Sequence, residues 1–93
     1  MAYDMSPPSI TVSGATCDDD PVVAIVAFRD TRQTVSIRNL ENGADAFIGE
    51  SDVTAATGYL LKQGEILNLD TRAAIYAITA SGTATFDIIE THW

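Results

Sequence analysis

The side chains that could support chemistry are few and widely spaced in this 93-residue chain. The single histidine is His92, which stands next to Trp93. A Ser-His-Asp triad needs a histidine held firmly between its nucleophile and its acid. Because residues near a chain end are often poorly ordered, we expect His92 to lie at the surface or at an interface, and we predict no catalytic residue.

Carboxylates are numerous, but their spacing matches no site of carboxylate chemistry. Glu50, Asp52, Glu65 and Asp70 offer candidate pairs for glycoside hydrolysis, which places one carboxyl group on each side of the scissile bond. Asp18-Asp19-Asp20 offers oxygen ligands for Ca²⁺, but it lacks the alternating Asp-x-Asp-x-Asp spacing with glycine of a calcium loop. We therefore expect no enzyme activity, no metal ion and no cofactor. Calcium binding at residues 18–20 and hydrolysis at the four acids remain as alternatives.

Arginines form the one concentration of positive charge. Three of the five Lys and Arg residues lie within ten positions, as Arg29, Arg32 and Arg38. On paired strands they would make a small basic patch, and arginine is favoured at protein interfaces because its planar group binds carboxylates with two hydrogen bonds. Ordinary surface charge that offsets nearby acids is the alternative.

The overall charge narrows the classes of partner. A formal net charge of −8 disfavours nucleic acids and anionic membranes, and it favours a partner with a basic surface. The longest apolar run, Val22–Phe28, is far shorter than the ~20 residues of a membrane helix. Met1–Pro8 has neither the cationic start nor the apolar core of a signal peptide. Cys17 is the only cysteine, so no disulfide forms within the chain.

The elements that must position these groups are short strands separated by Gly, Asn, Asp or Pro. This spacing predicts an all-β fold, a small antiparallel β-sandwich or jelly-roll-like domain over residues 21–93, preceded by an extended N-terminal arm over residues 1–20. Seven or eight strands are expected: residues 9–13, 21–30 with the apolar run 22–28, 34–40, 46–49, 65–69, 74–79 and 83–90, with the short segment 59–61 leading into a turn at residues 62–64.

Several details of these strands are testable. The uninterrupted apolar run Val22–Phe28 predicts a strand buried on both faces. Ala80-Ser81-Gly82 predicts a turn that pairs residues 74–79 with 83–90 as a hairpin. Gly14 is expected to end the first strand. We expect the aromatic side chains of Phe47, Tyr76 and Phe86 to pack in the core.

An ordered set of motifs resembles a pattern found in small structural proteins of tailed bacteriophages. The set covers about residues 34–90 and consists of Val35–Leu40, Gly49-Glu50-Ser51-Asp52-Val53-Thr54, Gly58-Tyr59-Leu60-Leu61, Gly64–Leu69 and Ile75–Ala84. Proteins with this pattern include capsid decoration, or cement, proteins with jelly-roll-like folds. The resemblance implies a virion protein on the capsid surface, made in the host cytoplasm, that binds the major capsid protein and bridges capsomers.

The same resemblance implies a homo-oligomer, with a trimer favoured and a dimer as the alternative. A host-binding or glycan-binding module of a tail or fibre is the alternative function. Residues of the arm and of the arginine-rich segment are the predicted partner interface: Pro7, Pro8, Ile10, Val12, Arg29, Arg32 and Arg38.

Overall fold

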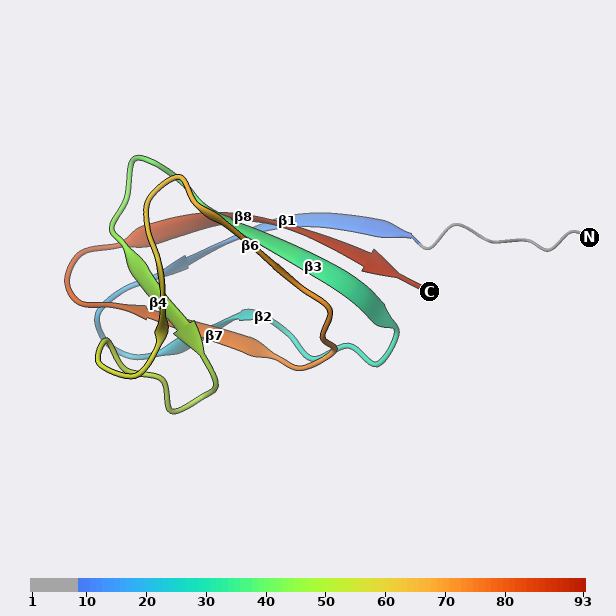
Figure 1. Cartoon of the computed structure of the whole chain (residues 1–93), viewed down its shortest axis with the longest axis horizontal. Helices are drawn as coiled ribbons and strands as arrows, with labels where there is room; N and C mark the ends of the chain where they lie inside the picture. Colours follow the sequence, from blue (N-terminus) through green and yellow to red (C-terminus); the bar gives the residue numbers. More distant parts are fainter. Residues whose placement is uncertain (1–8) are drawn as a thin grey trace, which may run out of the picture.

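Two four-stranded antiparallel sheets pack against each other in the protein, of which the computed structural model describes residues 9–93 (Figure 1). The strands are β1 (Ile10–Cys17), β2 (Val23–Val26), β3 (Arg32–Asn39), β4 (Ala46–Gly49), β5 (Tyr59–Leu61), β6 (Ile66–Leu69), β7 (Ile75–Thr79) and β8 (Ala84–His92). The predicted all-β sandwich is confirmed. Among these residues there is no helix long and apolar enough to cross a membrane.

The strand order is that of a jelly roll. One sheet has the order β1-β8-β3-β6, and the other has the order β2-β7-β4-β5. Antiparallel pairs join β1 to β8, β2 to β7, β3 to β6 and β4 to β5, as in one long hairpin that has been wrapped over itself. Successive pairs alternate between the sheets, which produces the two layers of Figure 1.

The core lies between the sheets and is built from alternate residues of each strand. On β8, Ala84, Phe86 and Ile88 are almost fully buried while Asp87 and Ile89 are exposed. The same alternation buries Val35 and Ile37 on β3. Of the three aromatics expected in the core only Phe86 is fully buried; Phe47 and Tyr76 are half-buried on strands of the other sheet.

The predicted hairpin between residues 74–79 and 83–90 is wrong. Strand β7 belongs to one sheet and β8 to the other, so the turn between them links the two layers. Gly82 adopts a φ of +79°, and the Thr79 hydroxyl donates a hydrogen bond to the Gly82 carbonyl at 2.7 Å. Two alternating strands around a glycine turn have the same sequence pattern whether they pair side by side or face each other across a core.

Residues 10–17, which were predicted to belong to the N-terminal arm, form strand β1 of the sandwich. Its residues pair one by one with β8, from Ile10 opposite Thr91 to Cys17 opposite Ala84. The strand continues through Gly14, which was expected to end it, and the buried Cys17 side chain contributes to the core. From Ile10 onward the chain therefore belongs to the sandwich, while the predicted interface residues Pro7 and Pro8 lie outside the described residues.

Strand β2 is shorter and less buried than its apolar sequence suggested. It spans Val23–Val26, and only Ile25 and Val26 are buried. Phe28 lies beyond its end and is 64% exposed. The run is apolar throughout, but β2 is an edge strand of its sheet and has no layer outside it.

Gly49, which begins the Gly-x-Ser-Asp-Val-Thr segment, and Gly58, which begins the Gly58-Tyr59-Leu60-Leu61 segment, are in close contact with neighbouring side chains. A Cβ atom on Gly49 would lie 2.8 Å from the Val53 side chain, and one on Gly58 would lie 2.7 Å from Val53 and from the Phe47 Cβ. The 50–58 loop thus closes around Val53, which is 6% exposed. This loop brings the chain from β4 back to β5 in the same sheet.

Candidate interaction surfaces

Within residues 9–93, the outward side of the β1-β8-β3-β6 sheet carries half of the exposed large hydrophobic side chains. Ile10, Val12, Ile66 and Ile89 are 64%, 73%, 59% and 44% exposed. We call this side the outer face; its residues are Ile10, Val12, Gly14 and Thr16 of β1, Thr85, Asp87, Ile89 and Thr91 of β8, Thr34, Ser36 and Arg38 of β3, and Ile66 and Asn68 of β6. Exposed large apolar side chains gathered on one side of a sheet indicate an interaction surface.

The strand registers arrange the outer face in rows that run across the sheet. One row contains Val12, Ile89, Ser36 and Asn68. The next contains Gly14, Asp87, Arg38 and Ile66. A shallow hollow of about 350 Å³ lies over both rows.

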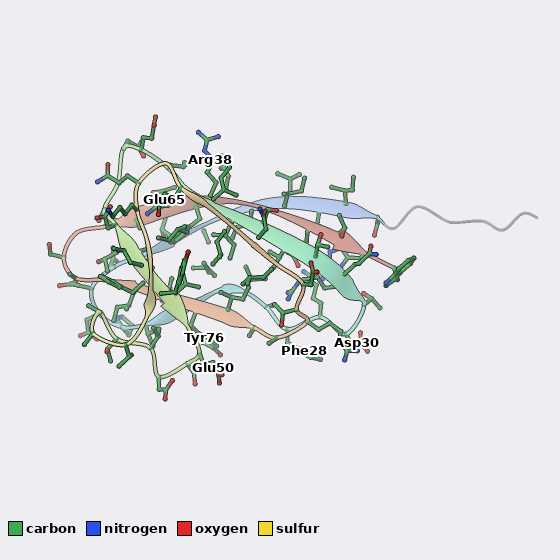
Figure 2. All side chains as sticks on the ribbon, viewed as in Figure 1. Phe28, Asp30, Arg38, Glu50, Glu65 and Tyr76 are labelled. Carbon is green, nitrogen blue, oxygen red and sulfur yellow. The ribbon has the colours of Figure 1, made fainter. Side chains whose placement is uncertain are left out.

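Only two of the outer-face residues are charged. Arg38 and Asp87 stand directly opposite each other on β3 and β8. Within residues 9–93 the ion pairs all converge on Glu90, and neither Arg38 nor Asp87 takes part in one. Figure 2 shows Arg38 projecting from this layer, away from the opposite sheet. The outer face is therefore electrically neutral in a chain of net charge −8.

The structure brings together three of the predicted interface residues. Ile10, Val12 and Arg38 all lie on the outer face. Arg29 lies elsewhere, with its side chain half-exposed. Arg32 is 3% exposed, so the predicted basic patch of three arginines does not form on the surface.

Arg32 instead anchors a buried polar cluster. Its Nε lies 2.7 Å from Glu90 Oε1, and its Nη1 donates to the carbonyls of Thr71 at 3.1 Å and Ala73 at 2.9 Å. Its Nη2 donates to the carbonyl of Ala27. The cluster fastens the β2–β3 and β6–β7 loops to β8, so its role is structural.

His92 completes this cluster. It was expected at the surface or at an interface, but it is buried within the domain. The residue is 6% exposed, and its Nε2 lies 3.9 Å from Glu90 Oε1 with no hydrogen-bond partner in the described chain. Glu90 and His92 continue the inward alternation of Phe86 and Ile88 on β8. That alternation is visible in the sequence and could have indicated their burial, but it was not used to place His92.

A second surface lies at the open side of the sandwich, beside the edge strand β6. Here an apolar hollow of about 490 Å³ is lined by Ile48, Tyr59, Leu67, Leu69 and Ile75, among others. Leu67 and Leu69 point inward from β6, whereas Ile66 and Asn68 belong to the outer face. We call this feature the edge hollow. Strand β6 is last in its sheet, so one side of its backbone has no partner strand within the described chain.

The acids proposed for hydrolysis do not assemble. Glu50 and Asp52 line a small polar hollow in the 50–58 loop, and neither Glu65 nor Asp70 contributes to it. Figure 2 shows Glu50 and Glu65 in separate parts of the molecule. No group of three His, Cys, Asp or Glu residues within residues 9–93 is placed to hold a metal ion. Asp18 instead accepts a hydrogen bond from the Thr83 hydroxyl.

Cys17 is the remaining nucleophilic group. Burial, and next the neighbouring Asp18 carboxylate, raise the pKa of its thiol from 9.0 to about 11, while a hydrogen bond with the Ala84 backbone acts in the opposite direction. Cys17 is 2% exposed, so its thiol is protonated and shielded at neutral pH.

Comparisons with known proteins add little. No protein-family model matches the chain, and no curated protein matches it. A solved chain from Bacillus endospore appendages, described as a novel family of disulfide-linked pili, aligns with 99% of this chain and 95% of its own length. The identity is 13% and the TM-score 0.49, so this likeness is too distant to indicate a shared function.

Proposed function

We propose that this protein is a structural component of a tailed-bacteriophage particle that decorates the capsid and bridges capsomers. The observation that carries the proposal is the presence of two separate candidate contact surfaces on one small domain. A bridging protein needs at least two such surfaces, and β6 separates the outer face from the edge hollow. The motif resemblance over about residues 34–90 supplies the phage context.

The edge hollow is the proposed contact with the major capsid protein. An extended segment that pairs with the free side of β6 would place alternate side chains over Leu67 and Leu69, as in the addition of a strand to a sheet edge. Tyr59 stands at the rim and is 61% exposed. The acidic balance of the chain favours a shell segment with basic residues beside its apolar ones.

Co-sedimentation with empty capsids of the phage that encodes the protein tests the proposal. We expect saturable binding, with Tyr59→Ala weakening it at least about tenfold, because tyrosine is a typical interface anchor and Tyr59 lines the hollow that the bound segment would fill. Phe28→Ala is the matched control, since Phe28 is an exposed aromatic that does not line the edge hollow. Absence of binding by the wild-type protein, or equal losses in the two variants, would contradict the proposal.

Binding to a glycan array instead of capsids would support the alternative, a host-binding module of a tail or fibre. Of the exposed aromatics within residues 9–93, only Tyr59 lines the edge hollow; Phe28 and Trp93 do not. A sugar site rimmed by several aromatic platforms is therefore not what this hollow offers.

A further inference from the structure

We propose that the outer face joins two copies of this chain about a two-fold axis. The inference concerns the isolated protein and does not depend on capsid binding. It starts from the neutrality of the face: two acidic molecules repel each other least where the meeting surfaces carry no net charge. Exposed Ile10, Val12, Ile66 and Ile89 provide the apolar area that such contact would bury.

The rows of the outer face are self-complementary under one specific operation. The axis lies in the plane between two facing sheets, parallel to the strands and midway between β8 and β3. It places β8 of each copy over β3 of the other. Because Arg38 and Asp87 are directly opposite on these two strands, each Arg38 then faces an Asp87 of the second copy.

The same operation matches large side chains with small ones. Within the Gly14–Asp87–Arg38–Ile66 row, it sets Ile66 over the Gly14 of the second copy. Within the neighbouring row, it sets Ile89 over Ser36. Sheets that pack face to face lie about 10 Å apart, so side chains of unequal size interdigitate best.

The size of the face sets the expected strength of association. Four strands spaced about 4.8 Å apart, with an average length of about seven residues at about 3.3 Å per residue, give an area of roughly 440 Å² per copy. Stable complexes bury about 800 Å² per partner. We therefore expect a weak, reversible dimer with a Kd of roughly 10 μM to 1 mM, which becomes populated where an assembly concentrates the copies.

Sedimentation velocity over protein concentrations from about 10 μM to 1 mM tests this interface. Wild type should shift from monomer towards dimer. Arg38→Asp brings two acids together, and Asp87→Arg brings two arginines together, so each variant alone should raise the dimer Kd at least about tenfold. The first variant makes the chain more acidic and the second makes it less acidic, so overall charge repulsion cannot explain a loss in both.

Mixing the two variants gives the decisive result. In the mixed dimer, the aspartate introduced by Arg38→Asp faces the arginine introduced by Asp87→Arg, and the unchanged Asp87 of the first chain faces the unchanged Arg38 of the second. Both pairs are then oppositely charged, so the mixture should regain association to within about threefold of wild type.

Three results would each overturn the proposal. They are a wild type that stays monomeric at all concentrations, unchanged dimerisation of either variant, and a mixture that stays monomeric. Circular dichroism spectra that match wild type establish that both variants, which are at exposed sites, are folded.

Discussion

Replacing Glu90 with glutamine tests the buried polar cluster most directly. Arg32 and Glu90 are 3% and 4% exposed, and their Nε–Oε1 distance is 2.7 Å. Glutamine retains the shape and can still accept a hydrogen bond, but it leaves the Arg32 guanidinium buried without a counter-charge. Breaking a buried pair from one side costs about 3–5 kcal/mol. Because one hydrogen bond survives, we expect about 3 kcal/mol for Glu90→Gln.

That loss is large for a domain of this size. At about 0.05–0.15 kcal/mol per residue, the 93 residues give a total stability of about 5–14 kcal/mol. Asp87→Asn is the matched control, because it removes one carboxylate charge from an exposed position of the same strand and should change stability by less than about 0.5 kcal/mol. Urea unfolding followed by circular dichroism measures both. If Glu90→Gln were no more destabilising than Asp87→Asn, the cluster would not hold the loops as described.

Replacing both Arg32 and Glu90 with apolar residues should still lower the stability of the fold. In other proteins, exchanging both members of a buried ion pair for hydrophobic residues is often neutral. Here Arg32 also donates to the carbonyls of Ala27, Thr71 and Ala73. The double variant Arg32→Met/Glu90→Leu would leave those carbonyls without their donor, at about 1–3 kcal/mol for each group that water cannot reach. We therefore expect the double variant to remain less stable than wild type.

Three further predictions concern single positions. Gly58→Ala should lower the free energy of unfolding in urea by about 1–3 kcal/mol, because the added Cβ would clash with Val53 and Phe47. Gly14→Ala is the control, since its Cβ would lie 3.5 Å from its nearest neighbour, and it should be neutral or stabilising. Equal losses in the two variants would contradict the close packing at Gly58. At pH 8, the Cys17 thiol of the folded protein should react with a thiol reagent at least about 100-fold more slowly than the same thiol in the unfolded chain, because its pKa is raised and it is buried. Fast labelling of the folded protein would contradict this. The same raised pKa gives a stability contribution that is present below about pH 9 and is lost as the pH rises through 11. Between pH 9 and pH 11 the unfolding free energy should therefore fall by about 2 kcal/mol more in wild type than in Cys17→Ala; parallel curves would show that the thiol does not ionise in this way.

The alternation of side chains along the strands was readable from the sequence because it is a local property. Short segments bounded by turn residues predicted β4 with its observed bounds, and the other predicted strands to within a few residues at most ends. The short segment before the turn at residues 62–64 forms β5. The inward positions of β8 follow the same period of two, including Glu90 and His92. Ile10, Val12 and Arg38 were among the interface residues predicted from the sequence, but nothing in the sequence indicated that they lie on the same face of one sheet.

What the sequence alone determined is therefore the fold class, the period of each strand and the acidic balance, all of which depend on neighbouring residues or on composition. Tertiary structure decided which strands pair and which face each other. The Ala80-Ser81-Gly82 turn permits either arrangement, and burial of the inner residues of β7 and β8 selects the crossing between sheets. The same long-range packing buries Arg32 against Glu90, 58 residues away, and sets Arg38 opposite Asp87 on a neutral face. A side chain's charge is written in the sequence, but its partner is fixed only when distant strands are brought together.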